Sequence, residues 1–199
     1  MSASLKQPVQ MTVPEFLAWC PVDDGQRWEL VDGVPRAMAP AKIGHGAIQS
    51  ELAALIRNHL LERRSPCTVV TAPGIMPRVR GATNLRVPDL GVTCTRIGPT
   101  DATLPDPVLV IEILSPSNQA ETWANVWTYT TIPSMREILV VHQVMQRAEL
   151  LRRDAGGDWP AEPLPVTDGQ LALDSIGFAV PLAAVYRTAP PLPPTRQGL

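Results

Sequence analysis

Residues 107–118, PVLVIEILSPSN, contain the stretch of sequence that decides the fold. From Val108 to Leu114 the run is apolar except for Glu112, which is typical of a central strand buried on both faces. Successive side chains of a strand alternate between the two faces, so Glu112 shares its face with apolar neighbours. An ionised carboxylate in such a place costs several kcal/mol unless something compensates its charge. A salt bridge or hydrogen bonds from backbone N–H groups would be a purely structural form of compensation.

On either side of this strand the pattern alternates between helices and further strands. The spacing of Thr12 and Glu15 predicts a capping box, and Asp32-Gly33 predicts a hairpin turn. Ser117 is the expected cap of the helix that follows the central strand. The expected helices cover 12–20, about 46–64 and the region after 117, and the expected strands cover 27–31, 34–38, 67–72, 74–79, 85–93, 108–114, 136–141 and 148–154. The sequence therefore predicts a mixed α/β domain with one sheet.

Length and composition limit the class of protein. The 199 residues, of which 45% are hydrophobic, fit one globular domain. We expect that domain to span 1–188 and the Pro-rich residues 189–199 to form a poorly ordered tail. No run approaches the roughly 20 apolar residues of a membrane helix. The N-terminal MSASLKQPVQ lacks the apolar run of a signal peptide, so a cytoplasmic location is expected.

Common site motifs do not occur in the sequence. Phosphate-loop, dinucleotide-binding, HExxH and GxSxG patterns are all absent. Cys20, Cys67 and Cys94 are far apart and form no CxxC pair, so we expect reduced, partly buried thiols rather than a disulfide framework or a zinc ribbon.

Positive charge is concentrated in the middle of the chain. The formal net charge is −2, yet residues 57–96 carry seven arginines against two acids. Arg78, Arg80 and Arg86 are the members expected to lie beside a phosphate backbone, although surface charge clusters are often only solvated. Trp123 and Trp127 are expected in the core, because they recur at helical spacing with alanines.

Two further acids lie in strand-like contexts. Asp89 follows Pro88 at the start of an apolar strand, and Glu29 lies inside the predicted strand RWELV. Adjacent strands would bring Asp89 and Glu112 within reach of one divalent cation, which would compensate both charges. Oxygen ligands of this kind suit Mg²⁺ or Mn²⁺. Since none of the three acids has an obvious cationic partner in the sequence, we expect them to form one metal site.

A Pro-Asp at the edge of a strand, followed by a Glu in a later apolar strand, resembles the PD-(D/E)xK nuclease superfamily. The segments RWELVDGVPRAMAP, RVPDLGV, PVLVIEILSPSN and REILVV, with His45 and Tyr129, resemble the Uma-two-type endonuclease family over about residues 12–150. The resemblance implies a restriction-endonuclease-like fold, in which helices flank a mixed sheet and a hairpin lies at the N-terminus. It also implies Mg²⁺- or Mn²⁺-dependent phosphodiester hydrolysis, with DNA as the expected substrate.

The same resemblance implies roles for individual residues. Asp89 and Glu112 would be catalytic metal ligands, joined by the backbone carbonyl of Ile113. Glu29 would be the upstream acid that completes the site. His45 would contact water or phosphate at the rim, although an ordinary polar residue near a helix start is an equally weighted alternative.

The pattern departs from the family at its lysine. Two residues after Glu112 the superfamily has a lysine where this chain has Leu114. The family's other position for the lysine, four residues before Tyr129, is Asn125 here. An Asn amide is uncharged and cannot act as a general base, so it stabilises a transition state less than Lys does.

Two other interpretations therefore stay open. The missing lysine favours a non-catalytic nucleic-acid-binding or regulatory module on a nuclease fold. Alternatively, the acids form a structural cluster with neither metal nor substrate. Small nucleases that cut both strands often pair two sites, so by analogy we also expect a homodimer.

Overall fold

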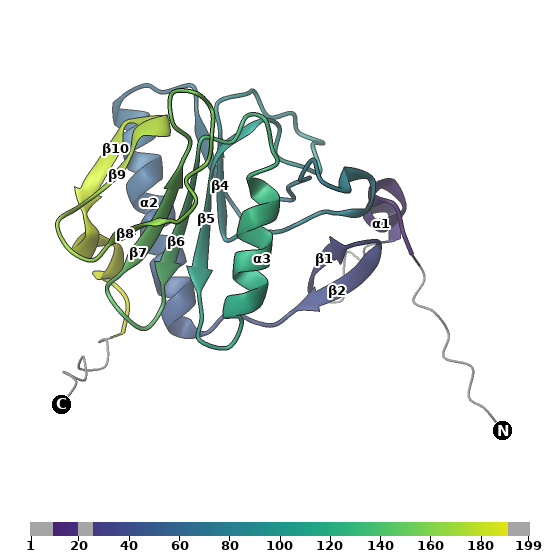
Figure 1. The fold of residues 1–199 in the computed structure, drawn as a ribbon, viewed down its shortest axis with the longest axis horizontal. Coiled ribbons are helices and arrows are strands. Elements are labelled where there is room, and N and C mark those ends of the chain that lie inside the picture. Colours follow the sequence, from purple (N-terminus) through teal and green to yellow (C-terminus); the bar gives the residue numbers. More distant parts are fainter. Residues whose placement is uncertain (1–9, 20–25, 191–199) are drawn as a thin grey trace.

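The computed structural model describes residues 10–19 and 26–190, and its centre is a six-stranded sheet with the order β3-β4-β5-β6-β7-β8 (Figure 1). The strands are β3 (Thr68–Thr71), β4 (Leu90–Thr93), β5 (Pro107–Leu114), β6 (Glu137–His142), β7 (Ala148–Arg152) and β8 (Leu164–Val166). The helices on its two faces are α2 (Ile43–Glu62) and α3 (Gln119–Tyr129). Within this sheet β5 and β6 are parallel and every other neighbouring pair is antiparallel. The predicted mixed α/β class is confirmed.

Strand β5 is buried on both faces, as its apolar run predicts. On one face Ile111 packs in the same core cluster as Ile48 and Leu52 of α2. On the other face Val110 packs with Val126 of α3. Helix α3 is also the crossover that joins the parallel strands β5 and β6. The two helices therefore approach the acid of β5 from opposite faces of the sheet.

The N-terminal elements are a short helix and a separate two-stranded hairpin, and the hairpin lies next to α3 (Figure 1). They are α1 (Val13–Trp19), β1 (Arg27–Val31) and β2 (Val34–Met38). Asp32 and Gly33 have φ values of 49° and 81°, as a tight two-residue hairpin turn requires. Leu30 and Leu85 exchange backbone hydrogen bonds of 2.8 and 3.0 Å. These bonds tie β1 to the segment that leads into β4, and so bring the hairpin to the predicted acids.

The C-terminal region adds elements that the sequence did not predict. They are β9 (Gln170–Leu173), β10 (Phe178–Pro181) and 3₁₀ helices at Asp174–Ile176 and Leu182–Tyr186; a further 3₁₀ helix, Gly81–Thr83, precedes β4. Leu171, Phe178 and Val185 complete the apolar cluster against α2. Residues 191–199, most of the predicted tail, lie outside the described residues. In the part of the chain that is described, no helix is long and apolar enough to cross a membrane.

Two predictions about α3 are wrong. Asn118, not Ser117, is the N-cap residue of the helix. Trp127 is 43% exposed rather than in the core, because the face of α3 toward the sheet carries Val126 and Tyr129, whereas Trp123 is partly buried and packs against that core cluster. At α1, by contrast, the predicted capping contact is present: the Thr12 N–H and hydroxyl both donate to the Glu15 carboxylate, at 2.8 and 2.7 Å.

Cys67 and Cys94 form a disulfide bond, so the prediction of reduced thiols is wrong for this pair. Thr68 of β3 lies opposite Thr93 of β4, and one further step along the register brings Cys67 opposite Cys94. The sequence does not show that these two strands are partners, which is why the bond could not be predicted from it. Cys20 lies outside the described residues.

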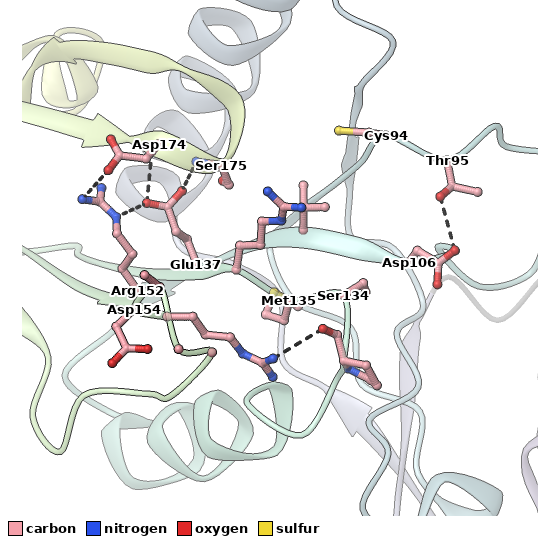
Figure 2. Close-up of a pocket in the computed structure, with 17 residues that line it drawn as sticks. Cys94, Thr95, Asp106, Ser134, Met135, Glu137, Arg152, Asp154, Asp174 and Ser175 are labelled. Atoms are coloured by element: carbon pink, nitrogen blue, oxygen red, sulfur yellow. Dashed lines mark hydrogen bonds and ion pairs between the residues drawn. The ribbon is translucent and has the colours of Figure 1, made fainter.

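A cavity of about 670 Å³ lies where β5 and β6 begin, at the end of the sheet remote from the tip of β5 (Figure 2). Glu137, only 1% exposed, forms part of its wall. Its carboxylate accepts hydrogen bonds from Arg152 Nε at 2.6 Å and from the Ser175 N–H at 2.8 Å. The charge of this buried acid is therefore compensated within the protein, which gives it a structural role.

Candidate functional site

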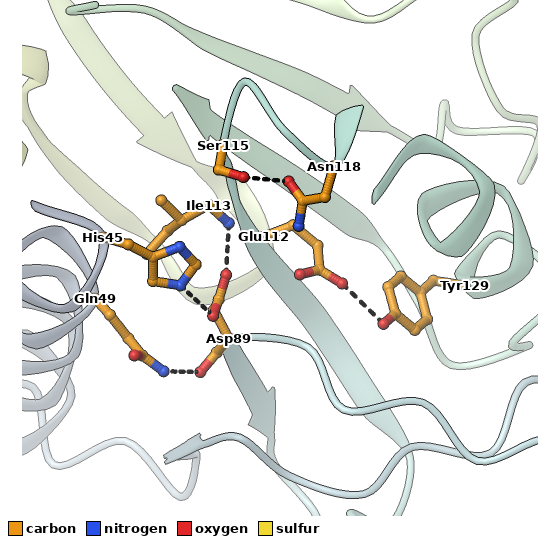
Figure 3. Close-up of polar contacts among 8 residues, drawn as sticks. All are labelled: His45, Gln49, Asp89, Glu112, Ile113, Ser115, Asn118 and Tyr129. Carbon is orange, nitrogen blue, oxygen red and sulfur yellow. Dashed lines mark hydrogen bonds and ion pairs between the residues drawn. The ribbon is translucent and has the colours of Figure 1, made fainter. Parts of the chain in front are cut away.

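Asp89 lies directly before β4, close to the end of β5 (Figure 3). Its Oδ2 accepts a hydrogen bond of 2.7 Å from the Ile113 N–H, and its Oδ1 lies 2.7 Å from Nε2 of His45. The Gln49 amide donates a hydrogen bond of 2.8 Å to the Asp89 main-chain carbonyl. His45 and Gln49 are four residues apart and so share one face of α2. Helix α2 and strand β5 thus fix both the carboxylate and the backbone of Asp89.

Glu112 is the carboxylate of β5, and it is 9% exposed. Leu90 pairs with Ile111, so one more step along the register places Asp89 beside Glu112. Burial, and after it the negative charge of Asp89, raises the pKa of Glu112 well above its ordinary value. Hydrogen bonds from the Tyr129 hydroxyl, at 2.9 Å, and from the Asp89 N–H oppose that rise. The two carboxylates therefore repel each other within one buried site.

Tyr129 is fully buried, and its hydroxyl points at Glu112 from α3 (Figure 3). Burial, with the Glu112 charge as the next cause, raises the pKa of Tyr129 well above 10. The hydroxyl therefore stays protonated and donates to the carboxylate. Asn125 lies four residues earlier, on the same face of α3 and one turn toward its N-terminus. This is the helix face on which the family lysine was expected.

Glu29 reaches the same region from β1 and is 4% exposed. Its Oε1 lies 3.6 Å from Nη1 of Arg86, so the expectation that it has no cationic partner is wrong. Burial raises the pKa of Glu29, and the Arg86 charge opposes that rise. The charge of Glu29 in turn contributes to the raised pKa of Glu112. All three predicted acids therefore belong to one electrostatic neighbourhood.

The carboxylates of the site are suitable ligands for a hard divalent cation, but they do not surround a cation by themselves. Within residues 10–19 and 26–190, no group of three His, Cys, Asp or Glu side chains is arranged to hold a metal ion. Mg²⁺, however, usually keeps several waters and takes only one or two carboxylates from the protein. Burial and then the Asp89 charge raise the pKa of Glu112, and a bound cation would favour its ionised form. Asp89 and Glu112 thus fit a carboxylate pair whose cation would also bind water and phosphate.

A protein-family model described as "Uma2: Putative restriction endonuclease" matches residues 13–183. The chain belongs to the Uma2 family. The uncharacterized protein slr1290 of Synechocystis sp. is 28% identical over 182 residues, which cover 89% of this chain and 92% of that protein. A crystal structure from Anabaena variabilis, described as a putative nuclease belonging to DUF820, is similar with a TM-score of 0.70 and 18% identity. That similarity covers 88% of this chain and 97% of the other, and it shows that the fold is shared.

The three arginines of this Uma2 chain that were predicted to face phosphate lie in different settings. Arg78 is exposed, and its main-chain N–H donates a hydrogen bond of 3.0 Å to the Thr131 hydroxyl, just beyond the end of α3. Arg80 is also exposed and forms an ion pair of 2.9 Å with Asp32 in the hairpin turn. Arg86 is buried. Of the three, Arg78 and Arg80 are accessible to a nucleic-acid backbone and Arg86 is not.

Sequence reasoning missed several parts of this Uma2 site. Gln49 was not singled out, although its spacing of four residues from His45 places both on one helix face. The Ser115 hydroxyl donates a hydrogen bond of 2.5 Å to Oδ1 of Asn118, which closes the turn between β5 and α3 (Figure 3). Another buried acid that the sequence did not indicate, Glu51 of α2, is paired with Arg187 and lies outside the candidate site.

Proposed function

We propose that this Uma2 chain hydrolyses phosphodiester bonds of DNA with the help of Mg²⁺ or Mn²⁺. The observation that carries the proposal is the pair Asp89 and Glu112. Asp89 lies directly before β4 and is partly buried, and Glu112 is buried on the neighbouring strand β5; the charge of Asp89 contributes, after burial, to the raised pKa of Glu112. A buried pair of like charges is unfavourable without a cation, and such pairs are common at functional sites.

The residues that would hold the cation are Asp89 and Glu112, with the main-chain carbonyl of Ile113 as a third ligand. When bound, a divalent ion polarises phosphate and lowers the pKa of a bound water. The Ile113 N–H and His45 fix one carboxylate, and Tyr129 fixes the other. This orientation by hydrogen bonds keeps the geometry constant during the reaction and so reduces reorganisation.

The exposed Arg78 and Arg80 support a nucleic-acid substrate. Their charges lie on the segment between β3 and β4 that leads toward Asp89. Arginine recognises phosphate well, because its planar group donates two parallel hydrogen bonds. A homodimer with two such sites would allow both strands of a duplex to be cut.

A second candidate function is a non-catalytic nucleic-acid-binding module. Asn125 is the observation that favours it, because the helix face beside Tyr129 carries no lysine. The position two residues after Glu112 offers none either, since Leu114 is 3% exposed and packs in the core. Such a module would bind DNA and the cation without cutting.

The deciding experiment is nicking of supercoiled plasmid with Mn²⁺, Mg²⁺ or EDTA, alongside calorimetric titration of the same cations. Asp89→Ala tests the site, and Asp168→Ala, an exposed acid, is the matched control. We expect cation-dependent nicking that is lost in Asp89→Ala and kept in the control. Cation and DNA binding without nicking would favour the binding module. Nicking that persists in Asp89→Ala, or the absence of cation binding, would refute the proposed nuclease site.

A further inference from the structure

Arg86 is buried, with 7% of its surface exposed, and no other basic residue in the described part of the chain is buried. Its main chain is fixed on both sides, because its N–H and C=O each form a hydrogen bond of 2.8 Å with Ile75. It lies three residues before Asp89, on the segment that leads into β4. This placement is too enclosed for the contact with a phosphate backbone that the sequence suggested.

The Arg86 guanidinium lies beside Glu29, one of the three acids of the site. Nη1 is 3.6 Å from Oε1 of Glu29, while Nε is buried and has no hydrogen-bond partner. A buried cation with an unsatisfied N–H is unfavourable for folding alone. This arrangement is therefore better explained by function than by stability.

Besides Arg86, His45 contacts Asp89 in the site, while the nearby arginine and lysine of the hairpin and of α2 are placed differently. Arg36 lies opposite Glu29 in the hairpin, but it is exposed and pairs with Glu121 at 4.0 Å. Lys42 lies immediately before α2, and its side chain forms no capping hydrogen bond. The charges of Arg86 and Arg36 both act on Glu29, but of these two arginines only Arg86 is buried beside it.

We propose that Arg86 is a positioning residue of the nuclease site, which orients the Glu29 carboxylate and supplies the fixed positive charge that positions 114 and 125 lack. The inference rests on the proposed metal-dependent hydrolysis. A guanidinium does not release its proton near neutral pH, so Arg86 does not act as a base. As a fixed cation it disfavours a bound metal ion but stabilises negative charge that develops on phosphate.

The Arg86 charge should weaken metal binding and raise the rate of hydrolysis. Because these two effects have opposite signs, the role is testable. The variants are Arg86→Met, Arg86→Lys and the neutral pair E29Q/R86M. Arg136→Met is the control, since Arg136 is an exposed arginine in the wall of the cavity at the far end of the sheet. For each protein, calorimetry measures the Mn²⁺ affinity, plasmid nicking measures the rate, and thermal unfolding measures the stability.

Arg86→Met should bind Mn²⁺ about tenfold more tightly, because one repelling charge is gone. It should nevertheless cut about 100-fold more slowly, as expected for the loss of one preorganised charge. Arg86→Lys should recover part of the rate. The neutral pair E29Q/R86M should unfold near the temperature of the parent, because no unpaired charge is left buried, and should still cut slowly.

A purely structural ion pair predicts a different result. Arg86→Met would then lose Mn²⁺ affinity, rate and stability together, and the neutral pair would regain rate along with stability. Either observation overturns the role proposed for Arg86, as does an Arg86→Met variant that binds and cuts like an active parent. A parent that neither binds Mn²⁺ nor cuts refutes the metal-dependent function itself, and this role with it.

Discussion

The Tyr129 hydroxyl donates a hydrogen bond of 2.9 Å to Oε1 of Glu112, and both side chains are buried. The bond joins α3 to the central strand across the core. It also favours the ionised form of an acid whose surroundings disfavour ionisation. Tyr129 of α3 thereby lowers the pKa of Glu112, the candidate metal ligand.

Removal of this hydroxyl should weaken cation binding. Without the hydrogen bond, the pKa of Glu112 rises further, so more work is needed to deprotonate the ligand. Tyr129→Phe should therefore bind Mn²⁺ less tightly, and it should lose about 1–3 kcal/mol of stability because an acceptor is left unsatisfied. Calorimetry and chemical denaturation measure the two quantities. Unchanged Mn²⁺ affinity at neutral pH would show that Glu112 is not a ligand.

The pH dependence of stability should report the buried acid directly. The folded-state pKa of Glu112 lies well above 4.5, so between the unfolded and folded values the folded state holds the extra proton. Stability is then greatest below the unfolded pKa and falls as the pH rises through the folded pKa, by about 1.4 kcal/mol for each unit of difference.

Glu112→Gln removes the ionisable group and, with it, the loss of stability at rising pH. In EDTA its unfolding temperature should match or approach that of the parent near pH 4 and exceed it increasingly as the pH rises. Glu162→Gln, an exposed acid, should follow the parent at every pH. A constant difference between Glu112→Gln and the parent across the pH range would contradict the raised pKa.

Restoring the family lysine should raise catalysis. Asn125 shares a helix face with Tyr129, so the ammonium of Asn125→Lys would be introduced beside the acids. One preorganised charge is worth on the order of 10²–10³ in rate, and Lys favours a helix more than Asn does. Plasmid nicking with Mn²⁺ measures the gain. Equal rates for the variant and an active parent would mean that position 125 faces away from the reaction.

Arg78 and Arg86 should differ in their effect on DNA binding. Arg78 is exposed, so Arg78→Ser should weaken binding to all sequences and reduce the slope of log K against log salt by about one. Arg86→Met should leave that slope unchanged, because Arg86 is buried and does not contact the phosphates. Fluorescence anisotropy at several salt concentrations makes the comparison. Identical slopes for the parent and Arg78→Ser would exclude this surface.

Elements with strong periodicity could be predicted from the sequence. Strand β5 was recognised from its apolar run, and the hairpin from Asp32-Gly33. The strands after residue 160 were missed, because β8 contains Pro165 and its burial is low. Helix α2 begins at Ile43 rather than near Gly46, since Lys42 offers no capping side chain to mark the start.

The composition of the site was harder to predict than the fold. Glu137 begins one apolar strand and Glu112 interrupts another, yet only the structure shows that Glu137 is paired with Arg152 and that Glu112 is not paired with any arginine among the described residues. The contact of His45 with Asp89 likewise depends on how α2 packs. The sequence suggested a phosphate contact for Arg86, or positive charge near Asp89, but the local sequence carries no information on its burial beside Glu29 of the hairpin.

The Cys67–Cys94 bond makes a closed covalent ring of the chain between β3 and β4, and that ring contains Arg78, Arg86 and Asp89. A ring keeps its two arms attached after a single cut. A protease nick in the loop between these strands would therefore leave a chain that migrates as one band on a denaturing gel without thiols. With thiols added, the same gel would show two fragments. Dithiothreitol in an assay buffer opens this ring, and in a nicked chain it decides whether the two fragments stay covalently joined.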